Sequence, residues 1–87
     1  MAYRILIKPQ AEKAFSRMAK PLRRRIARTI DALAENPRPE GARKLVGSEC
    51  AYRIRVGDYR VVYEVAERVL VVYVIRIGHR KDVYRGL

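Results

Sequence analysis

The sequence predicts an α+β domain with the element order β-α-α-β-β-β, in which a helical hairpin covers one face of a mostly antiparallel sheet. Two observations lead to this fold class. Apolar residues recur at helical spacing before residue 36, and they alternate as in strands from residue 43 onward. The 87 residues have room for one modest core, so we expect a single domain spanning residues 1–87.

The first half of the chain predicts one strand and two helices. Residues 3–7 are rich in β-forming side chains and favour a short strand. Residues 10–19 carry apolar side chains at helical spacing, and Pro21 begins a second helix that ends at Asn36-Pro37. The apolar stripe of this second helix consists of Leu22, Ile26, Ile30 and Leu33. Residues 36–41 are predicted to form a loop.

The second half predicts three strands. Two alternating runs, residues 52–56 and 59–65, are separated by Gly57-Asp58, which is typical of a hairpin closed by a two-residue turn. Residues 66–68 form a plausible second turn. The run 69–75 is apolar on both faces, which suits a central strand covered on both sides.

This hairpin places three arginines on one face. With only Gly57 and Asp58 in the loop, Arg55 lies directly opposite Arg60, and Arg53 shares their face. The other face carries Tyr52, Ile54, Val56, Tyr59, Val61 and Tyr63. Like charges opposite each other destabilise a sheet, so the arrangement indicates a bound anion, and phosphate fits it best.

The end of the chain is predicted to return to the same place. If residues 69–75 pair antiparallel with residues 59–65, the segment Gly78-His79-Arg80 emerges near the arginines. Tyr84 follows four residues later and can fold over the same spot. His79 and Tyr84 are therefore candidate site residues, and histidine is the side chain whose unperturbed pKa lies near neutrality. The structural alternative for His79 is a hydrogen bond at the end of the strand. The structural alternative for Tyr84 is burial in the core, where it would anchor the tail.

Charge and composition narrow the class of partner. The net charge of +11 and the pI near 10.5 favour a polyanionic partner, either nucleic acid or an acidic protein. Further basic residues lie outside the hairpin, either as a solvated surface or as contacts to RNA: Arg23, Arg24, Arg25, Arg28 and Lys44. One histidine and one cysteine make a zinc site improbable, and we expect no cofactor.

The sequence also bears on the compartment. No apolar run approaches the ~20 residues that a membrane-spanning helix needs, so no membrane association is expected. The single cysteine cannot form an intramolecular disulfide, which suits a reducing compartment, and a cytoplasmic location is expected.

Several short motifs together resemble the RelE family of toxins from type II toxin–antitoxin modules. They are Lys44-Leu45 before Gly47, Tyr52-Arg53-Ile54-Arg55, Gly57 to Tyr63, Gly78-His79-Arg80, and Val83-Tyr84. The resemblance covers nearly the whole chain. It implies a metal-independent endoribonuclease that enters the ribosomal A site and cleaves messenger RNA by attack of the RNA's own 2′-hydroxyl. It also implies an acidic RelB-like antitoxin, through which alone operator DNA would be contacted.

The resemblance also implies a site. The family's catalytic basic residues correspond to Arg53, Arg55, Arg60 and Arg80, and its tail tyrosine to Tyr84. Family members often have lysine at the first two positions. Arginine is effectively never deprotonated, so it binds phosphate well but is a poor base. On this interpretation Arg55 and Arg60 stabilise charge, Arg53 positions the substrate, and Arg80 serves the leaving oxygen.

Two other classes of function compete with this one. A non-enzymatic inhibitor like the gyrase-targeting ParE toxins would share the scaffold but lack the catalytic basic set. A plain RNA-binding module would show aromatic side chains among the outward-facing arginines, whereas here the tyrosines alternate inward.

Overall fold

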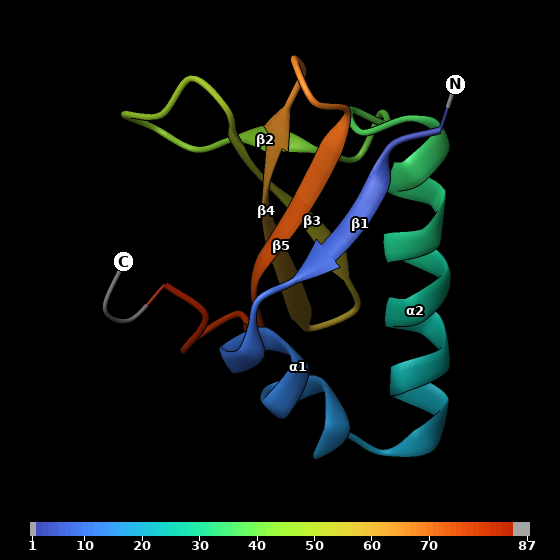
Figure 1. Ribbon diagram of the computed structural model, residues 1–87. Helices are drawn as coiled ribbons and strands as arrows, with labels where there is room; N and C mark the ends of the chain where they lie inside the picture. The colour runs from blue at the N-terminus through green and yellow to red at the C-terminus, as the bar shows by residue number, and fades with distance from the viewer. Residues whose placement is uncertain (1, 85–87) are drawn as a thin grey trace.

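A computed structural model describes residues 2–84 and has an α+β fold (Figure 1). The elements in chain order are β1 (Arg4–Ile7), α1 (Pro9–Ser16), α2 (Lys20–Glu35), β2 (Arg43–Lys44), β3 (Ala51–Val56), β4 (Tyr59–Ala66) and β5 (Val71–His79). Pro9 and Pro21 stand in the first turns of the two helices, where the missing N–H costs no hydrogen bond. The predicted fold class is confirmed.

The strands form one sheet in the order β1-β5-β4-β3-β2, and only β1 runs parallel to its neighbour. The hairpin of β3 and β4 has the predicted register: Val56 pairs with Tyr59, and Arg55 pairs with Arg60. β4 and β5 pair antiparallel as predicted, but the register differs: residue 75 was expected beside Tyr59 and Arg60, whereas Arg60 lies opposite Gly78. The two-residue turn Gly57-Asp58 therefore determines which side chains of β3 and β4 share a face.

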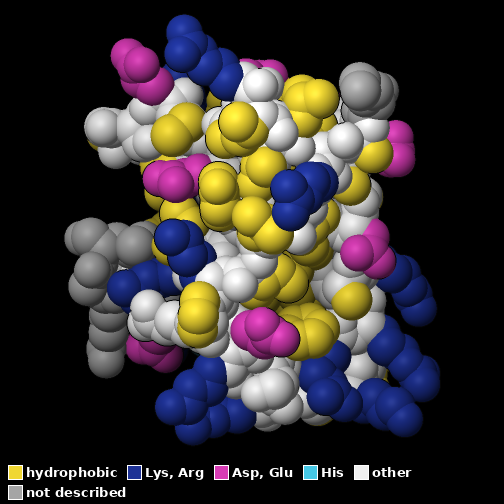
Figure 2. Space-filling model, in the orientation of Figure 1, with side chains coloured by type: hydrophobic (Ala, Val, Ile, Leu, Met, Phe, Trp, Pro, Cys, Tyr) yellow, Lys and Arg dark blue, Asp and Glu magenta, His cyan; other side chains and the backbone are white. Residues whose placement is uncertain are grey.

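The core lies between the helices and one face of the sheet. Ile26, Ile30 and Leu33 of α2 are buried in one cluster with Val61 and Tyr63 of β4. Ala11 of α1 and Val72, Val74 and Ile77 of β5 belong to the same cluster. In the space-filling view the surface over β1 and β5 is largely hydrophobic (Figure 2). Among the described residues, neither helix has the length and apolar character that crossing a membrane requires.

Three differences from the predicted elements stand out. The first helix was expected over residues 10–19, but it ends at Ser16. The chain was expected to be β from residue 43 onward, but the two-residue strand β2 was not among the four predicted strands, because two residues are too few to show a period. The last strand was expected over residues 69–75, but it spans Val71–His79. Leu70 has a φ of 54°, a left-handed conformation that belongs to the turn before the strand. Gly78 and His79 are therefore strand residues.

A polar network ties the loop before β2 to the sheet. Arg38 donates from Nε to the Tyr52 hydroxyl at 2.8 Å and forms an ion pair with Glu67. Glu67 also accepts a hydrogen bond from the Tyr3 hydroxyl at 2.7 Å. The buried Tyr63 hydroxyl donates to the Pro37 carbonyl at 2.6 Å, and burial raises the pKa of Tyr63 to about 12, so it remains a donor. These bonds hold the loop that leads to Arg43.

We predict that Glu67 contributes to stability at neutral pH and not in acid. Hydrogen bonds from Tyr3 and then from Arg38 lower the pKa of Glu67. A lowered carboxyl pKa stabilises the fold above the unfolded-state pKa, near 4.3, and this contribution is lost as pH falls through the folded-state pKa. Glu67→Gln should therefore melt lower than wild type at about pH 6, and the difference should shrink toward pH 3. The control is Glu49→Gln, at an exposed position; equal pH profiles for the two variants would contradict the prediction.

Candidate functional site

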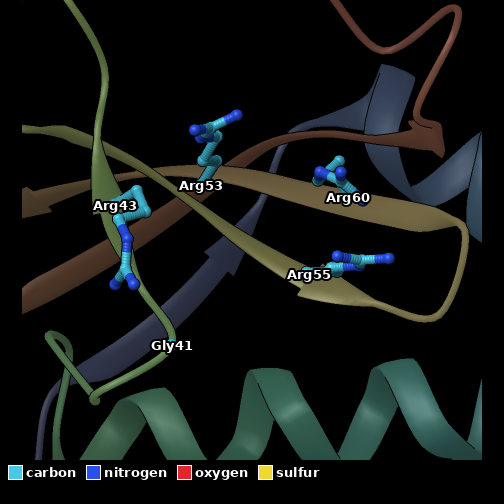
Figure 3. Close-up of a pocket in the computed structure, with 5 residues that line it drawn as sticks. All are labelled: Gly41, Arg43, Arg53, Arg55 and Arg60. Carbon is cyan, nitrogen blue, oxygen red and sulfur yellow. The ribbon is translucent and has the colours of Figure 1, made fainter.

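Three arginines of the β3–β4 hairpin project from one face of the sheet. Arg55 and Arg60 are direct partners across the ladder, and Arg53 lies two residues before Arg55 on the same strand. Arg53 and Arg60 are half-buried, whereas Arg55 is exposed. Figure 3 shows their guanidinium groups on the same side of the two strands. The predicted cluster is thus assembled, on the face opposite the helix-covered core.

A fourth arginine, which the sequence analysis missed, completes the cluster. Arg43 of β2 is the ladder partner of Arg53 and so shares its face. Together with Gly41, the four arginines line an open cavity of about 230 Å³ (Figure 3). The only signal in the sequence was a basic residue ten positions before Arg53. That signal places Arg43 beside Arg53 only once β2 is known to pair with β3.

The cavity has an unbalanced positive charge. Within residues 2–84 no carboxylate forms an ion pair with any of its four arginines. Their side-chain hydrogen bonds go to neutral backbone carbonyls: Arg43 Nη1 donates to Glu40 O at 2.9 Å, Arg55 Nε to Gly57 O at 3.3 Å, and Arg60 Nη1 to Tyr59 O at 3.4 Å. Each guanidinium has five N–H donors, so donors remain for a ligand. Guanidinium groups around a carboxylate-free cavity are suited to binding phosphate.

The chain end returns to the hairpin turn, but neither Arg80 nor Tyr84 lines the four-arginine cavity. The backbone N–H of Arg80 donates to Asp58 O in the hairpin turn at 2.8 Å, which holds the exposed Arg80 beside that turn. Gly78 lies opposite Arg60 and has no side chain, and Val83 occupies the space, 3.6 Å from where a Cβ would stand. Val83 is 4% exposed. The tail is therefore seated next to Arg60, and Tyr84 continues from it, partly exposed.

His79 is not brought to the arginines. It pairs with Tyr59, and its ring contacts the Tyr59 ring edge-on at a centroid distance of 5.6 Å. Side chains alternate along a strand, so His79 lies on the face opposite Gly78 and Arg60. Its Nδ1 accepts a hydrogen bond from the Lys81 N–H at 3.2 Å. The strand pairing predicted from sequence was right, but His79 belongs to the strand, so its ring faces away from the cavity.

The weaker RNA-binding candidates lie outside the cavity. Arg23, Arg24, Arg25 and Arg28 belong to α2, which covers the other sheet face. Lys44 alternates with Arg43 and pairs with Tyr52, so its side chain also lies on that other face. In the described part of the chain, no three His, Cys, Asp or Glu side chains are grouped closely enough to hold a metal ion.

Comparisons with known proteins agree with one another. A family model described as "ParE toxin of type II toxin-antitoxin system, parDE" matches residues 5–84. The mRNA interferase toxin RelE of Escherichia coli K12 is 32% identical over 83 residues, covering 93% of this chain and 86% of that protein.

Solved structures give the same result. The archaeal RelE–RelB complex of Pyrococcus horikoshii contains a chain with a TM-score of 0.83 and 33% identity, covering 95% of this chain and 100% of the other. The isolated E. coli RelE toxin has a TM-score of 0.81 and 30% identity, covering 90% and 84%. The first of these structures is a complex of RelE with RelB.

We predict that the arginine pair trades stability for anion binding. Arg60→Gln removes the repulsion from Arg55 and should raise the free energy of unfolding at low salt, on the order of 0.2–1 kcal/mol. Adding phosphate should raise the melting temperature of the wild type more than that of the variant. Arg68→Gln removes the same charge at an exposed turn position and serves as the control in a thermal melt. If the two variants respond alike, no anion is held between Arg55 and Arg60.

Proposed function

The chain belongs to the RelE/ParE family of toxins from type II toxin–antitoxin systems, and we propose that it is an endoribonuclease that cleaves messenger RNA in the ribosomal A site. One observation carries the proposal: four arginines line a single cavity in which no described carboxylate neutralises them. A protein that acted only through an apolar or shape-based contact would have no use for this costly grouping.

The proposed reaction is an in-line transfer at phosphorus. The 2′-oxygen of the RNA attacks the adjacent phosphorus, so a P–O2′ bond forms while the P–O5′ bond breaks. The 2′-hydroxyl loses a proton, and the departing 5′-oxygen gains one. Negative charge accumulates on the phosphoryl oxygens between these events. Positioned guanidinium groups stabilise such charge without reorganising at the moment of reaction.

The residues divide these tasks by position. Arg55 and Arg60 face each other across the ladder and can bind the phosphoryl oxygens from two sides. Arg53 and Arg43, on the adjoining strand pair, orient the RNA strand. Arg80, held beside the hairpin turn, neutralises or protonates the leaving oxygen. Much of the rate enhancement then comes from positioning and charge, as phosphoryl chemistry permits.

Proton removal is the task for which arginine is unsuited. Tyr84 is the candidate that the tail geometry favours, since Val83 is seated over Gly78 beside Arg60. It can accept the 2′-hydroxyl proton or stack on a base. His79 is the weaker candidate, because its ring contacts Tyr59 on the other face.

The partners follow from the charge and the family. An acidic RelB-like antitoxin, folding around this domain with net charge +11, would cover the arginine face or displace the tail with Tyr84. Ribosome and messenger RNA are the proposed targets, in the cytoplasm. Operator DNA would be contacted only through the antitoxin.

A ParE-like protein inhibitor is the second candidate, because the matching family model carries the ParE description. The two functions separate in a cell extract. An endoribonuclease blocks protein synthesis and leaves DNA supercoiling intact. An inhibitor of a gyrase-type target blocks DNA supercoiling and leaves protein synthesis intact.

Induced expression of the wild type should arrest growth, and Arg60→Ala or Arg80→Ala should relieve the arrest. Loss of one charge-stabilising donor typically costs about 10²–10³ in rate. Primer extension on messenger RNA in a translation extract measures the cleavage, and Arg68→Ala is the folded control. The upstream fragment should end in a 2′,3′-cyclic phosphate or its 3′-phosphate product. A 3′-hydroxyl end, or full toxicity of both folded variants, would refute the proposed chemistry.

Single-turnover cleavage between about pH 5.5 and 9 distinguishes the two proton-transfer candidates. Tyr84→Phe should slow cleavage by as much as ~10²–10⁴-fold if the hydroxyl takes the proton. His79→Ala should keep the wild-type pH profile, because the ring lies on the opposite face from Arg60. If the fall in cleavage rate at low pH disappears only in His79→Ala, histidine is the base instead.

A further inference from the structure

The β3–β4 turn carries a second grouping of arginines outside the cavity. Gly57 has a φ of +61°, a conformation that favours glycine. The guanidinium of Arg25, from α2, lies against this glycine: Nη1 is 3.4 Å and Nη2 is 3.6 Å from the position that a Cβ would occupy. Arg55 reaches the same residue from the other side of the sheet by donating Nε–H to the Gly57 carbonyl. Figure 3 shows α2 passing along the hairpin.

This convergence has no internal charge compensation. Among residues 2–84, no carboxylate forms an ion pair with Arg25 or Arg55, although Asp58 is the next residue in the turn. Two like charges drawn to one turn repel each other, and the single hydrogen bond at 3.3 Å is a weak compensation. Arg25 is exposed, so nothing in the core obliges its side chain to lie there. Binding of an external anion would reduce the repulsion between the two guanidinium groups.

We propose that Arg25 and the Gly57 turn, together with Arg55, form a second phosphate-binding subsite for a phosphodiester group of an RNA chain. Arg55 belongs both to this subsite and to the four-arginine cavity, so the two phosphate positions are contiguous. Gly57 lets the Arg25 guanidinium approach the turn closely, because it presents no side chain. The inference rests on the proposed RNA-cleaving function and extends its site around the hairpin tip onto α2.

The surroundings favour RNA over an isolated anion. Figure 2 shows Lys and Arg side chains gathering at the end of the molecule where α1 connects to α2, which is the end at which α2 begins. A polyanion that leaves the subsite can continue along this basic end, whereas a single phosphate ion gains nothing from it. The phosphodiester can come from the cleaved strand itself or from ribosomal RNA that flanks it.

The test compares Arg25→Gln with a matched control, Arg24→Gln. Arg24 is the neighbouring exposed arginine of the same helix turn and lines a different depression with Phe15 and Lys20. Both changes remove one charge and keep helix propensity. Arg25→Lys, which keeps the charge but loses the forked geometry, should bind with intermediate affinity. Thermal melts establish that each variant is folded.

Two ligands are titrated over a range of salt concentrations: a short single-stranded RNA with 2′-methoxy groups, which cannot be cleaved, and purified ribosomes carrying messenger RNA. Arg25→Gln should weaken binding about tenfold and reduce the salt slope by roughly 0.7, as loss of one phosphate contact to a single strand predicts. A deficit with both ligands assigns the subsite to the cleaved strand. A deficit with ribosomes alone assigns it to ribosomal RNA.

The same titrations separate a failure of the subsite from a failure of the proposed RNA-cleaving function. If the wild type binds RNA or ribosomes but Arg25→Gln and Arg24→Gln are equally affected, the charge acts without a site and the subsite is refuted. If the wild type binds neither ligand at any salt concentration, the proposed RNA-cleaving function itself is refuted.

Discussion

The two-residue turn Gly57-Asp58 is the constraint on which the site depends. Because the loop contains only these residues, Arg55 must lie opposite Arg60. Val56 and Tyr59, which pair with each other, must then face the helices. A slip of one residue in the pairing would turn the arginines of the slipped strand toward the core. The same turn accepts hydrogen bonds from Arg55 Nε and from the Arg80 backbone, so it also fixes where the last strand ends.

The rest of the fold tolerates the strain that this turn imposes. Arg55 and Arg60 repel each other on one face, while Val61 and Tyr63 are completely buried on the other. Val62, on the arginine face, is also buried and lies in register between Arg53 and Arg76. The ladder is irregular next to it, at Val62/Tyr63, a bulge of the kind often found beside functional sites. Apolar burial beneath the hairpin therefore offsets the charge collected above it.

The cavity draws on distant parts of the chain, and each segment is held by an identifiable contact. Arg43 arrives on β2, at the end of a loop secured through Arg38 to Tyr52 and Glu67. The tail arrives because Gly78 leaves room for Val83. An all-arginine set concentrates permanent positive charge, and arginine is a poor base because it is effectively never deprotonated.

Local patterning in the sequence determined the hairpin, its register and the shared face of Arg53, Arg55 and Arg60, because strand alternation and a two-residue turn are properties of neighbouring residues. Long-range contacts decided the rest. Arg43 joins the site only through the pairing of a two-residue strand, which is too short to show a pattern. His79 faces away from the cavity because the last strand runs past Gly78, and this extension depends on pairing with β4. Arg25 reaches Gly57 only because α2 packs under the sheet, and helix periodicity alone does not specify that packing.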